Sequence, residues 1–183
     1  ICHGSFKNGL KHGEGHEQFS NGDATTVVIN GLPEGYGEYI WSDGSNYKGD
    51  FKQGVRNGFG IWKKNNEKNC EAYRGHYLLD RKSGYGVYIW ENGEYYKGDF
   101  FQDVRHGYGE FYSNGALAYK GMWENGKEAP HLKGQKRKNH HLHDKDKEYR
   151  NNISIVDLSE GDIQASQEDR AKSNTTNNPR YNY

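Results

Sequence analysis

The feature that most constrains the fold is an internal repeat of glycine and aromatic residues with a period of about 23 residues. Two copies are plain, YKGDFKQGVRNGFGIW at residues 47–62 and YKGDFFQDVRHGYGEF at residues 96–111. The repeat has one anchor position per unit, spaced by 23, 22, 26, 23 and 23 residues: Gly4, Val27, Gly49, Gly75, Gly98 and Gly121. Glycine pairs recur beside these anchors: Gly13 and Gly15, Gly35 and Gly37, Gly58 and Gly60, Gly84 and Gly86, Gly107 and Gly109.

Each unit is predicted to form a β-hairpin. Asn-Gly and Asp-Gly steps supply the positive φ angles of tight turns, which we expect at residues 21–22, 43–44, 92–93 and 114–115. Between the turns the residues alternate with period two, so Tyr47 and Phe51 share one face while Lys48 takes the other. The pattern predicts an all-β fold, an elongated twisted antiparallel sheet solenoid of repeated hairpins. It has five full units and a sixth that stops after Trp123.

Composition indicates how such hairpins pack. The chain has 25 Gly and 26 Phe, Trp and Tyr together, yet only 32% hydrophobic residues, which is too few aliphatic side chains for an ordinary core. A strand glycine leaves space for a bulky group, so we expect each paired glycine to receive a ring from a neighbouring strand. The predicted framework of the repeat is Gly49, Gly58, Gly60, Gly84, Gly86, Gly98, Gly107, Gly109, Trp62, Trp90 and Trp123.

A sharp change in composition near Pro130 predicts two regions. Residues 1–130 hold 23 of the 25 glycines and 23 of the 26 aromatic residues. Residues 131–183 are rich in Asn, Lys, His, Asp and Ser, which predicts a polar and disordered C-terminal tail. The half-unit that ends at residues 128–130 is expected to cap the repeats, because Pro removes a hydrogen-bond donor.

Charge and cysteine usage exclude several classes of protein. Lys plus Arg and Asp plus Glu both number 25, so the chain-wide basic field of a nucleic-acid-binding protein is absent. No apolar run approaches the ~20 residues of a membrane helix. Cys2 and Cys70 are too few for a disulfide framework, which indicates a reducing, cytoplasmic location. Ile1 stands where a Met is expected, so the sequence is interpreted as a fragment.

The repeat resembles the MORN (membrane occupation and recognition nexus) repeat over about residues 1–126, through Y-x-G-x-F/W followed by G-x-G. It departs from that pattern at Val27, at Asp80 and Asp103 where a loop glycine is lost, and at an insertion around 65–70. The resemblance implies a twisted antiparallel ribbon without catalytic activity. Such arrays serve as scaffolds, dimerisation surfaces, cytoskeletal or ciliary components and phospholipid-associated modules, and some are attached to lipid kinases or SET-domain methyltransferases.

No residues are predicted to be catalytic or to bind a metal or a cofactor. His12 and His106 share a repeat position with Glu34, Asn57 and Ser83, which indicates a solvated turn. Asp50 and Asp99 also follow the repeat, whereas catalytic acids should interrupt it. A histidine cluster in the tail matches no structural zinc spacing, so adventitious metal binding is favoured there: His140, His141 and His143, followed by Asp144 and Asp146.

The tail carries two further candidate segments. The basic residues Lys133, Lys136, Arg137 and Lys138 could contact acidic lipid or a partner, act as a nuclear import signal, or be a solvated linker. An apolar island amid acids could be a docking peptide or arise by chance: Ile153, Ile155, Val156, Leu158 and Ile163.

Three functions remain open. The first is a non-catalytic scaffold that binds protein partners in a cytoskeletal or ciliary assembly. The alternative is a peripheral membrane module for acidic phospholipids, or the accessory repeat region of a larger enzyme. Dimers, antiparallel or end to end, are compatible with open ribbon ends.

Overall fold

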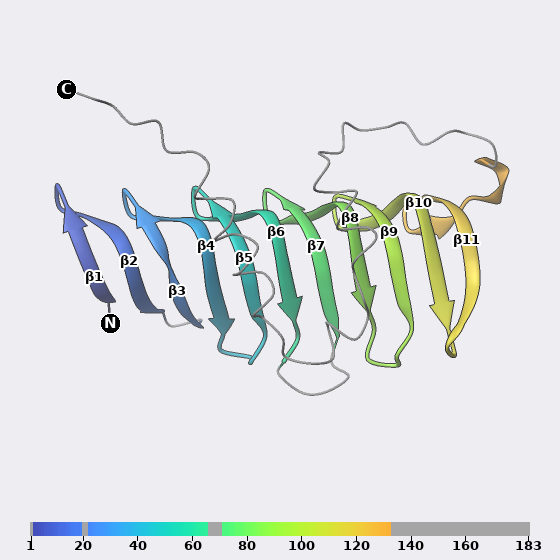
Figure 1. Ribbon diagram of the computed structural model, residues 1–183, viewed down its shortest axis with the longest axis horizontal. Helices are drawn as coiled ribbons and strands as arrows, with labels where there is room; N and C mark the ends of the chain where they lie inside the picture. Colours follow the sequence, from blue (N-terminus) through green and yellow to red (C-terminus); the bar gives the residue numbers. More distant parts are fainter. Residues whose placement is uncertain (1, 20–21, 66–70, 133–183) are drawn as a thin grey trace, which may run out of the picture. The chain divides into compact units, whose positions relative to one another are not determined.

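A single antiparallel sheet of 12 strands accounts for most of residues 2–19, 22–65 and 71–132, which the computed structural model describes (Figure 1). The strands follow one another in sequence order: β1 (Cys2–Lys7), β2 (Leu10–Phe19), β3 (Gly22–Ile29), β4 (Leu32–Trp41), β5 (Asn46–Lys52), β6 (Val55–Lys63), β7 (Ala72–Leu78), β8 (Arg81–Ile89), β9 (Tyr95–Phe101), β10 (Val104–Ser113), β11 (Ala116–Glu124) and β12 (Lys127–Glu128). A 3-10 turn, η1 (Pro130–Leu132), follows β12. The predicted all-β hairpin array is therefore confirmed.

Some predictions concern residues that the structure describes, and others concern residues that it does not describe. Within these residues, no helix has the length and apolar character needed to cross a membrane. The predicted disordered tail lies outside the described residues from position 133 onward, so the division at Pro130 stays a prediction. The insertion around residues 65–70 lies almost wholly outside them as well.

A row of glycines crosses the sheet at the middle of the strands. From β4 to β11, each strand places a glycine directly opposite a glycine of the next: Gly37, Gly49, Gly60, Gly75, Gly86, Gly98, Gly109 and Gly121. The anchor glycines and the second glycines of the pairs thus alternate along one line. Since no side chain stands on this line, a flat ring can lie directly on the backbone of two strands.

Tyrosine rings fill the space above this row. Tyr47 is fully buried, and a Cβ added at Gly60 would lie 2.3 Å from its ring. Its hydroxyl passes over Gly49 of its own strand and donates to the carbonyl of Asp50 at 3.1 Å. The hydroxyls of Tyr73, Tyr96 and Tyr119 likewise donate to the carbonyl three residues later, at 3.1, 3.0 and 3.1 Å. The prediction of rings lodged over glycines is therefore confirmed for the second glycine of three pairs, Gly60, Gly86 and Gly109.

The first glycine of each pair has another role, so the prediction for Gly58, Gly84 and Gly107 is wrong. These three residues have φ angles of 124°, 70° and 70°, which favour glycine for backbone reasons. A Cβ at Gly58 would lie 2.7 Å from the Asp50 side chain and near no ring. The register of each hairpin shifts here, as it does between β5 and β6, so the first glycine belongs to a bulge.

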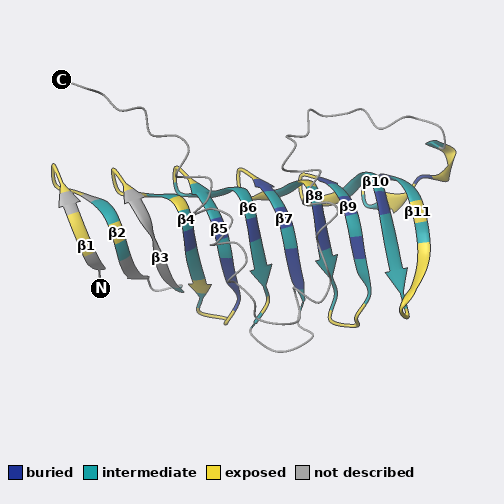
Figure 2. Cartoon of the chain, in the orientation of Figure 1, coloured by how far each residue is buried: buried dark blue, intermediate teal, exposed yellow. Residues whose placement is uncertain are grey.

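The rings pack edge to face in an unbroken series along one face, which we call the ring face. Tyr47, Tyr77, Tyr73, Phe100, Tyr96 and Trp123 follow one another with ring centroids 5.2 Å apart at each step. Edge-to-face pairs of this kind stabilise a fold by about 0.5–1.5 kcal/mol each beyond the area they bury. Figure 2 shows buried residues in the strands from β4 to β10, and Trp123 adds one on β11. The core is thus a single layer of rings on one sheet.

The tight turns fall at the other end of the strands from most of those predicted. Two-residue turns with positive φ at both central residues join β1 to β2 and every second pair after it: residues 8–9, 30–31, 53–54, 79–80, 102–103 and 125–126. At the opposite ends, among the residues that the structure describes, only the predicted turn at 114–115 has this geometry, and the predicted turn at 21–22 lies partly outside those residues. In the turns at 43–44 and 92–93 only the glycine has positive φ, and the side chain of Asp43 or Asn92 accepts from the backbone two residues later, at 2.9 and 3.1 Å.

Consecutive tight turns are joined to one another by hydrogen bonds. The amide of the second turn residue donates to a carbonyl of the preceding hairpin, from Gly54 to Pro33 at 2.9 Å and from Asp80 to Arg56 at 3.0 Å. Asp80 and Asp103 also accept, through Oδ1, from the backbone amides of Arg56 and Lys82 at 2.9 and 2.8 Å. The aspartates that replace the loop glycines therefore fasten one hairpin to the previous one.

The sequence predicted that the repeat stops after Trp123. This prediction is wrong, because β11 continues to Glu124 and pairs with the short β12. Ala129 is 1% exposed, and its amide donates to the carbonyl of Met122 at 2.8 Å. The turn η1 follows directly. These contacts close the C-terminal end of the sheet where the cap was expected.

Candidate functional site

Three cations lie over the aromatic rings of the ring face. Arg56, Lys82 and Arg105 occupy the same repeat position, four residues before the second glycine of a pair, on β6, β8 and β10. Each therefore lies beside the tyrosine that covers the glycine row. A cation above an aromatic ring is attracted by its negative face, by about 0.5–2 kcal/mol depending on desolvation. The ring face thus combines an apolar surface with regularly repeated positive charge.

Arg56 is held by the rings of Tyr77 and Tyr47 and by the carboxylate of Asp80. Its guanidinium carbon lies 4.7 Å from the ring centroid of Tyr77 and 5.6 Å from that of Tyr47. The guanidinium also pairs with Asp80, with 3.1 Å between Nε and Oδ1, and donates to the Asp80 carbonyl at 2.8 Å. This charge is therefore fixed in place and partly neutralised.

Lys82 projects between two tyrosines in the middle of the ring face. Its Nζ lies 4.5 Å from the ring centroid of Tyr88 and 5.5 Å from that of Tyr73. Burial lowers the pKa of the Lys82 ammonium, and the nearby Asp103 carboxylate opposes that shift. The Asp103 Oδ1 already accepts from the Lys82 backbone amide.

Arg105 lies at the centre of four rings. Its guanidinium carbon is 4.3 Å from the ring centroid of Trp123 and 5.5 Å from that of Trp90. Its Nη2 donates to the carbonyl of Gly126 at 2.8 Å. Trp123 is 2% exposed and donates through Nε1 to the carbonyl of Gly109 at 3.3 Å, so the framework tryptophans Trp90 and Trp123 form the walls around this cation.

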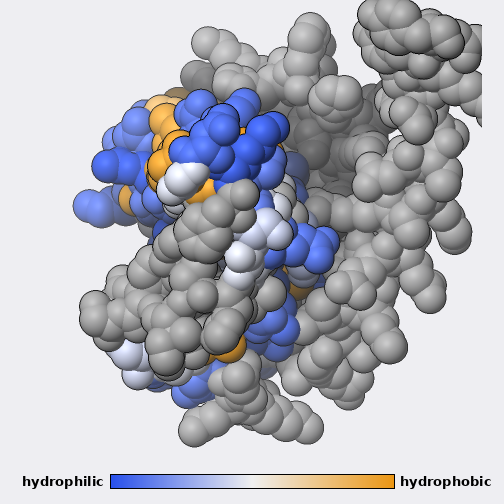
Figure 3. Space-filling model, turned by 90° about the vertical axis from the view of Figure 1, so that its left-hand side faces the viewer, coloured by the Kyte–Doolittle hydropathy of each residue, from blue (hydrophilic) through white to orange (hydrophobic). Residues whose placement is uncertain are grey.

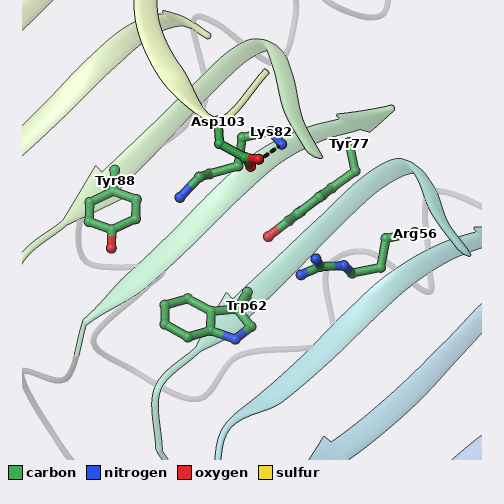
Figure 4. Close-up of a pocket in the computed structure, with 6 residues that line it drawn as sticks. All are labelled: Arg56, Trp62, Tyr77, Lys82, Tyr88 and Asp103. Carbon is green, nitrogen blue, oxygen red and sulfur yellow. Dashed lines mark hydrogen bonds between the residues drawn. The ribbon is translucent and has the colours of Figure 1, made fainter. Parts of the chain in front are cut away.

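A hollow of about 150 Å³ opens between two of these cations (Figure 4). It is lined by Arg56, Trp62, Tyr77, Lys82, Tyr88 and Asp103. In Figure 4 the Lys82 ammonium, the Tyr77 hydroxyl and the Arg56 guanidinium are directed to the same space, beside the indole of Trp62. Burial raises the pKa of Tyr77 and of Tyr88 above their ordinary value, so both hydroxyls are protonated. Two cations and flat rings can bind an anionic group attached to an apolar or aromatic one.

The middle of the opposite face of the sheet is polar and self-paired. Glu38 pairs with Lys48 at 2.9 Å, and Glu110 pairs with Lys120 at 2.8 Å and with Lys97 at 3.5 Å. The hydrogen bond from Lys120 is the main reason why the pKa of Glu110 is lowered. Cross-strand pairs of opposite charge satisfy one another, so the middle of this face offers less unpaired charge than the ring face does.

The acids and histidines that the sequence predicts to be non-catalytic make contacts within the sheet. Asp50 and Asp99 accept through Oδ2 from the backbone amides of Phe59 and Tyr108 at 3.0 and 3.3 Å, which fastens the bulge of each hairpin. His106 packs on Phe101 with centroids 5.8 Å apart. Within the described ranges, no group of three or more His, Cys, Asp or Glu residues could hold a metal ion. The tail histidines, the basic residues Lys133, Lys136, Arg137 and Lys138, and the apolar island all lie outside those ranges.

Sequence reasoning found the framework and missed the cations. It placed Gly60, Gly86, Gly109, Trp62 and Trp90 on the ring face, where the structure has them near Tyr47, Tyr73, Tyr88 and Arg105. A detectable signal for the cations was present, because Arg or Lys recurs four residues before the second paired glycine in three successive hairpins. The face on which these cations lie could not be predicted, because the bulge shifts the register and simple alternation then does not reveal which face these residues occupy.

Comparison with known families gives one match. The MORN repeat family model matches five segments, 2–24, 28–46, 47–67, 73–95 and 96–116, which together make up more than half of the chain. Each segment begins near the first strand of a hairpin in the sheet. The search of curated proteins gives no match.

Proposed function

Because the chain belongs to the MORN repeat family, we propose that it is a non-catalytic scaffold whose ring face binds acidic segments of protein partners. MORN repeats are modules for interaction or membrane association, and the family is generally non-catalytic. The single observation that carries the proposal is the row of cations over rings, Arg56, Lys82 and Arg105, with a hollow between the first two. This surface suits a peptide that carries carboxylates beside apolar or aromatic side chains.

Lys82 is the residue of this row that we expect to contribute most to binding. Arg56 already pairs with Asp80, and Arg105 already donates to Gly126. The Lys82 ammonium instead lines the hollow beside two tyrosine rings. A carboxylate placed there meets a partly desolvated cation, and a charge-assisted bond in such a site is stronger than one in water.

The binding proposal is tested with two matched, fluorescently labelled peptides in which tryptophan alternates with glutamate or with lysine. Fluorescence anisotropy is expected to show at least tenfold tighter binding of the acidic peptide, and added salt should weaken it. Lys82→Met keeps the apolar stem and should weaken binding at least fivefold. Lys48→Met, on the opposite face, is the control and should leave binding unchanged. Equal affinity for both peptides would refute the proposal.

We further propose that the partner belongs to a cytoskeletal or ciliary assembly in the cytoplasm. A cation position that recurs in three successive hairpins suits repetitive filaments, since neighbouring units can bind neighbouring subunits. A tagged chain expressed in ciliated cells should remain with the detergent-resistant axoneme. Recovery in the detergent-soluble fraction alone would count against this assembly and would leave peptide binding to be judged separately.

Acidic phospholipid is the second candidate ligand, because the same cation row could receive a phosphate group. Sedimentation with phosphatidylcholine vesicles, with and without phosphatidylserine, separates the two candidates. Pelleting that requires phosphatidylserine and is lost in Lys82→Met supports the membrane module. A chain that stays in solution at low salt excludes it.

A further inference from the structure

A second surface lies at the tight-turn end of the strands, on the face opposite the rings. Large apolar side chains flank the two-residue turns there and are 41–57% exposed: Leu10, Ile29, Leu32, Leu78, Phe101 and Val104. We call these six residues the turn-edge strip. In Figure 3, hydrophobic residues gather among hydrophilic ones near the upper end of the molecule, the end at which Figure 1 places these turns.

The register puts the strip on the face away from the rings. Tyr77 and Phe100 belong to the ring series, so the next residues, Leu78 and Phe101, point to the other side. Val104 pairs directly with Phe101, and directly paired residues share a face. Ile29 and Leu32 pair in the same way and occupy equivalent repeat positions. The strip therefore lies on four hairpins, in a row separate from Arg56 and Lys82, and Lys52 and Val55 occupy the equivalent position on β5–β6.

Exposed apolar residues at these positions are unfavourable for the isolated chain. Hairpin ends are usually polar, and contiguous apolar patches on soluble proteins mark interaction sites. The turn beside Leu78 adds Leu79, which is 70% exposed and has a φ of 50°. A non-glycine residue in this conformation costs about 1–2 kcal/mol. Because Leu79 is both exposed and strained, its side chain is not expected to stabilise the fold.

The strip is also rigid. The turns are fastened in series by the backbone hydrogen bonds that Asp80, Asp103 and Gly126 donate to the preceding hairpin, at 3.0, 3.0 and 2.9 Å. A row held in this way loses little freedom on binding, and that preorganisation increases affinity.

We infer that the turn-edge strip docks an amphipathic α-helix of a partner protein, with acidic residues beside its apolar stripe. Successive hairpins repeat every ~9.6 Å along the sheet, since each contributes two strands. An α-helix returns to the same face after seven residues, or ~10.5 Å, so a slightly inclined helix presents one apolar layer to each hairpin. An extended peptide returns to the same face every ~6.6 Å and does not match this spacing.

The charged residues beside the turn-edge strip indicate which charge the partner helix should carry next to its apolar stripe. Exposed bases stand in the same row, where Lys7 pairs with Leu10, Lys52 with Val55, and Arg81 with Leu78. Asp80 is directed to Arg56 and Asp103 lines the hollow on the ring face. The strip thus offers apolar side chains with bases between them, which is complementary to a helix with glutamate beside its leucines.

The inference is tested on the full chain with designed helical probes of about four heptads. One has leucine at a and d and glutamate at e and g, a second has lysine in place of glutamate, and a third redistributes the same residues with period two. Fluorescence anisotropy is expected to show the first probe binding at least tenfold more tightly than either of the others. Since Leu78 and Phe101 are more than half exposed, the double variant Leu78→Ser, Phe101→Ser should keep its strand circular dichroism and lose at least tenfold in affinity.

Two control variants separate this strip from other surfaces. Leu117→Ser alters a leucine that is 49% exposed at the opposite ends of the strands, and binding should not change. Lys82→Met should weaken the ring-face peptide and leave the helical probe unaffected, so either proposal can fail alone. The inference is overturned if the double variant binds the first probe normally or if the period-two probe binds equally well. It is also overturned if the strip instead mediates vesicle pelleting or concentration-dependent dimers that the double variant abolishes.

Discussion

At the scale of single residues, the fold depends on tyrosine lying on glycine. Tyr73 is fully buried, and its hydroxyl lies 2.4 and 2.5 Å from the Cβ positions that Gly75 and Gly86 lack. Real Cβ atoms do not approach other atoms so closely. The ring cannot swing away, because it packs edge to face on Tyr77 and Phe100. The same arrangement recurs at Tyr47 and Tyr96 and explains why the core needs few aliphatic residues.

The two glycines of one pair should therefore respond differently to the same substitution. Gly86→Ala forces a Cβ into the Tyr73 ring and is expected to destabilise the protein by about 3 kcal/mol. Gly84→Ala meets nothing closer than the His76 Cβ at 3.7 Å, so it should cost only about 1 kcal/mol for its positive φ. Thermal unfolding measures both variants, and equal losses would contradict the ring-on-glycine arrangement. Gly86→Ala should also cost less when Tyr73 is replaced by leucine.

At the scale of the element, each hairpin has a tight turn at one end and a longer or variable turn at the other. In four of the tight turns, Asn or Gln precedes glycine with positive φ, which suits this geometry: residues 8–9, 30–31, 53–54 and 125–126. The turn at 79–80 has Leu79 and Asp80 instead, and Asp80 receives the Arg56 amide and guanidinium in return. The positive φ of Asp80 is tolerated there because its side chain connects two hairpins.

Replacing the strained leucine should stabilise the hairpin. Leu79→Asn puts a residue that tolerates positive φ at a position 70% exposed, and a gain of about 0.5–1 kcal/mol is expected in denaturant unfolding. Asp80→Gly also suits the backbone, yet it removes the partner of Arg56 and should cost about 1–2 kcal/mol. A loss of stability in Leu79→Asn would show that its side chain contributes to folding rather than to docking.

At the scale of the whole sheet, the strands pair only with their neighbours in the sequence. In such a repeat array, stability is close to a sum of unit and nearest-neighbour contributions, so local damage stays local. The two candidate surfaces are also repeated, because the cation row occupies three successive hairpins and the turn-edge strip lies on four. Both proposed ligands are therefore elongated segments that cross several strands.

A defect at the C-terminal end should remain there. Ala129→Asp places a charge at a position that is 1% exposed, where burial of an unpaired carboxylate is unfavourable. Hydrogen exchange is expected to increase at least tenfold in β11 while β5 and β6 keep their protection. Simultaneous loss of protection in all strands would show that the sheet unfolds as one unit instead.

The all-β hairpin array, its first five units and the tyrosines that lie on the second glycines of the pairs could be predicted from the sequence, whereas the sixth hairpin, closed by β12, could not. The predictable features follow from the period of about 23 residues and from the pairing of Tyr47-type tyrosines with Gly60-type glycines, because both are local patterns copied along the chain. Even the family could be recognised from residues that recur in phase, and the family match confirms it.

The face that each remaining side chain occupies depends on how the hairpins stack, which the three-dimensional structure shows. The bulge at Gly58, Gly84 and Gly107 shifts the register between the tight turn and the glycine row, so alternation counted from the turn fails beyond it. That shift places Arg56 over rings and leaves Leu78 on the opposite face. The candidate surfaces depend on cross-strand neighbours more than on sequence neighbours, and those neighbours are fixed only when the hairpins stack.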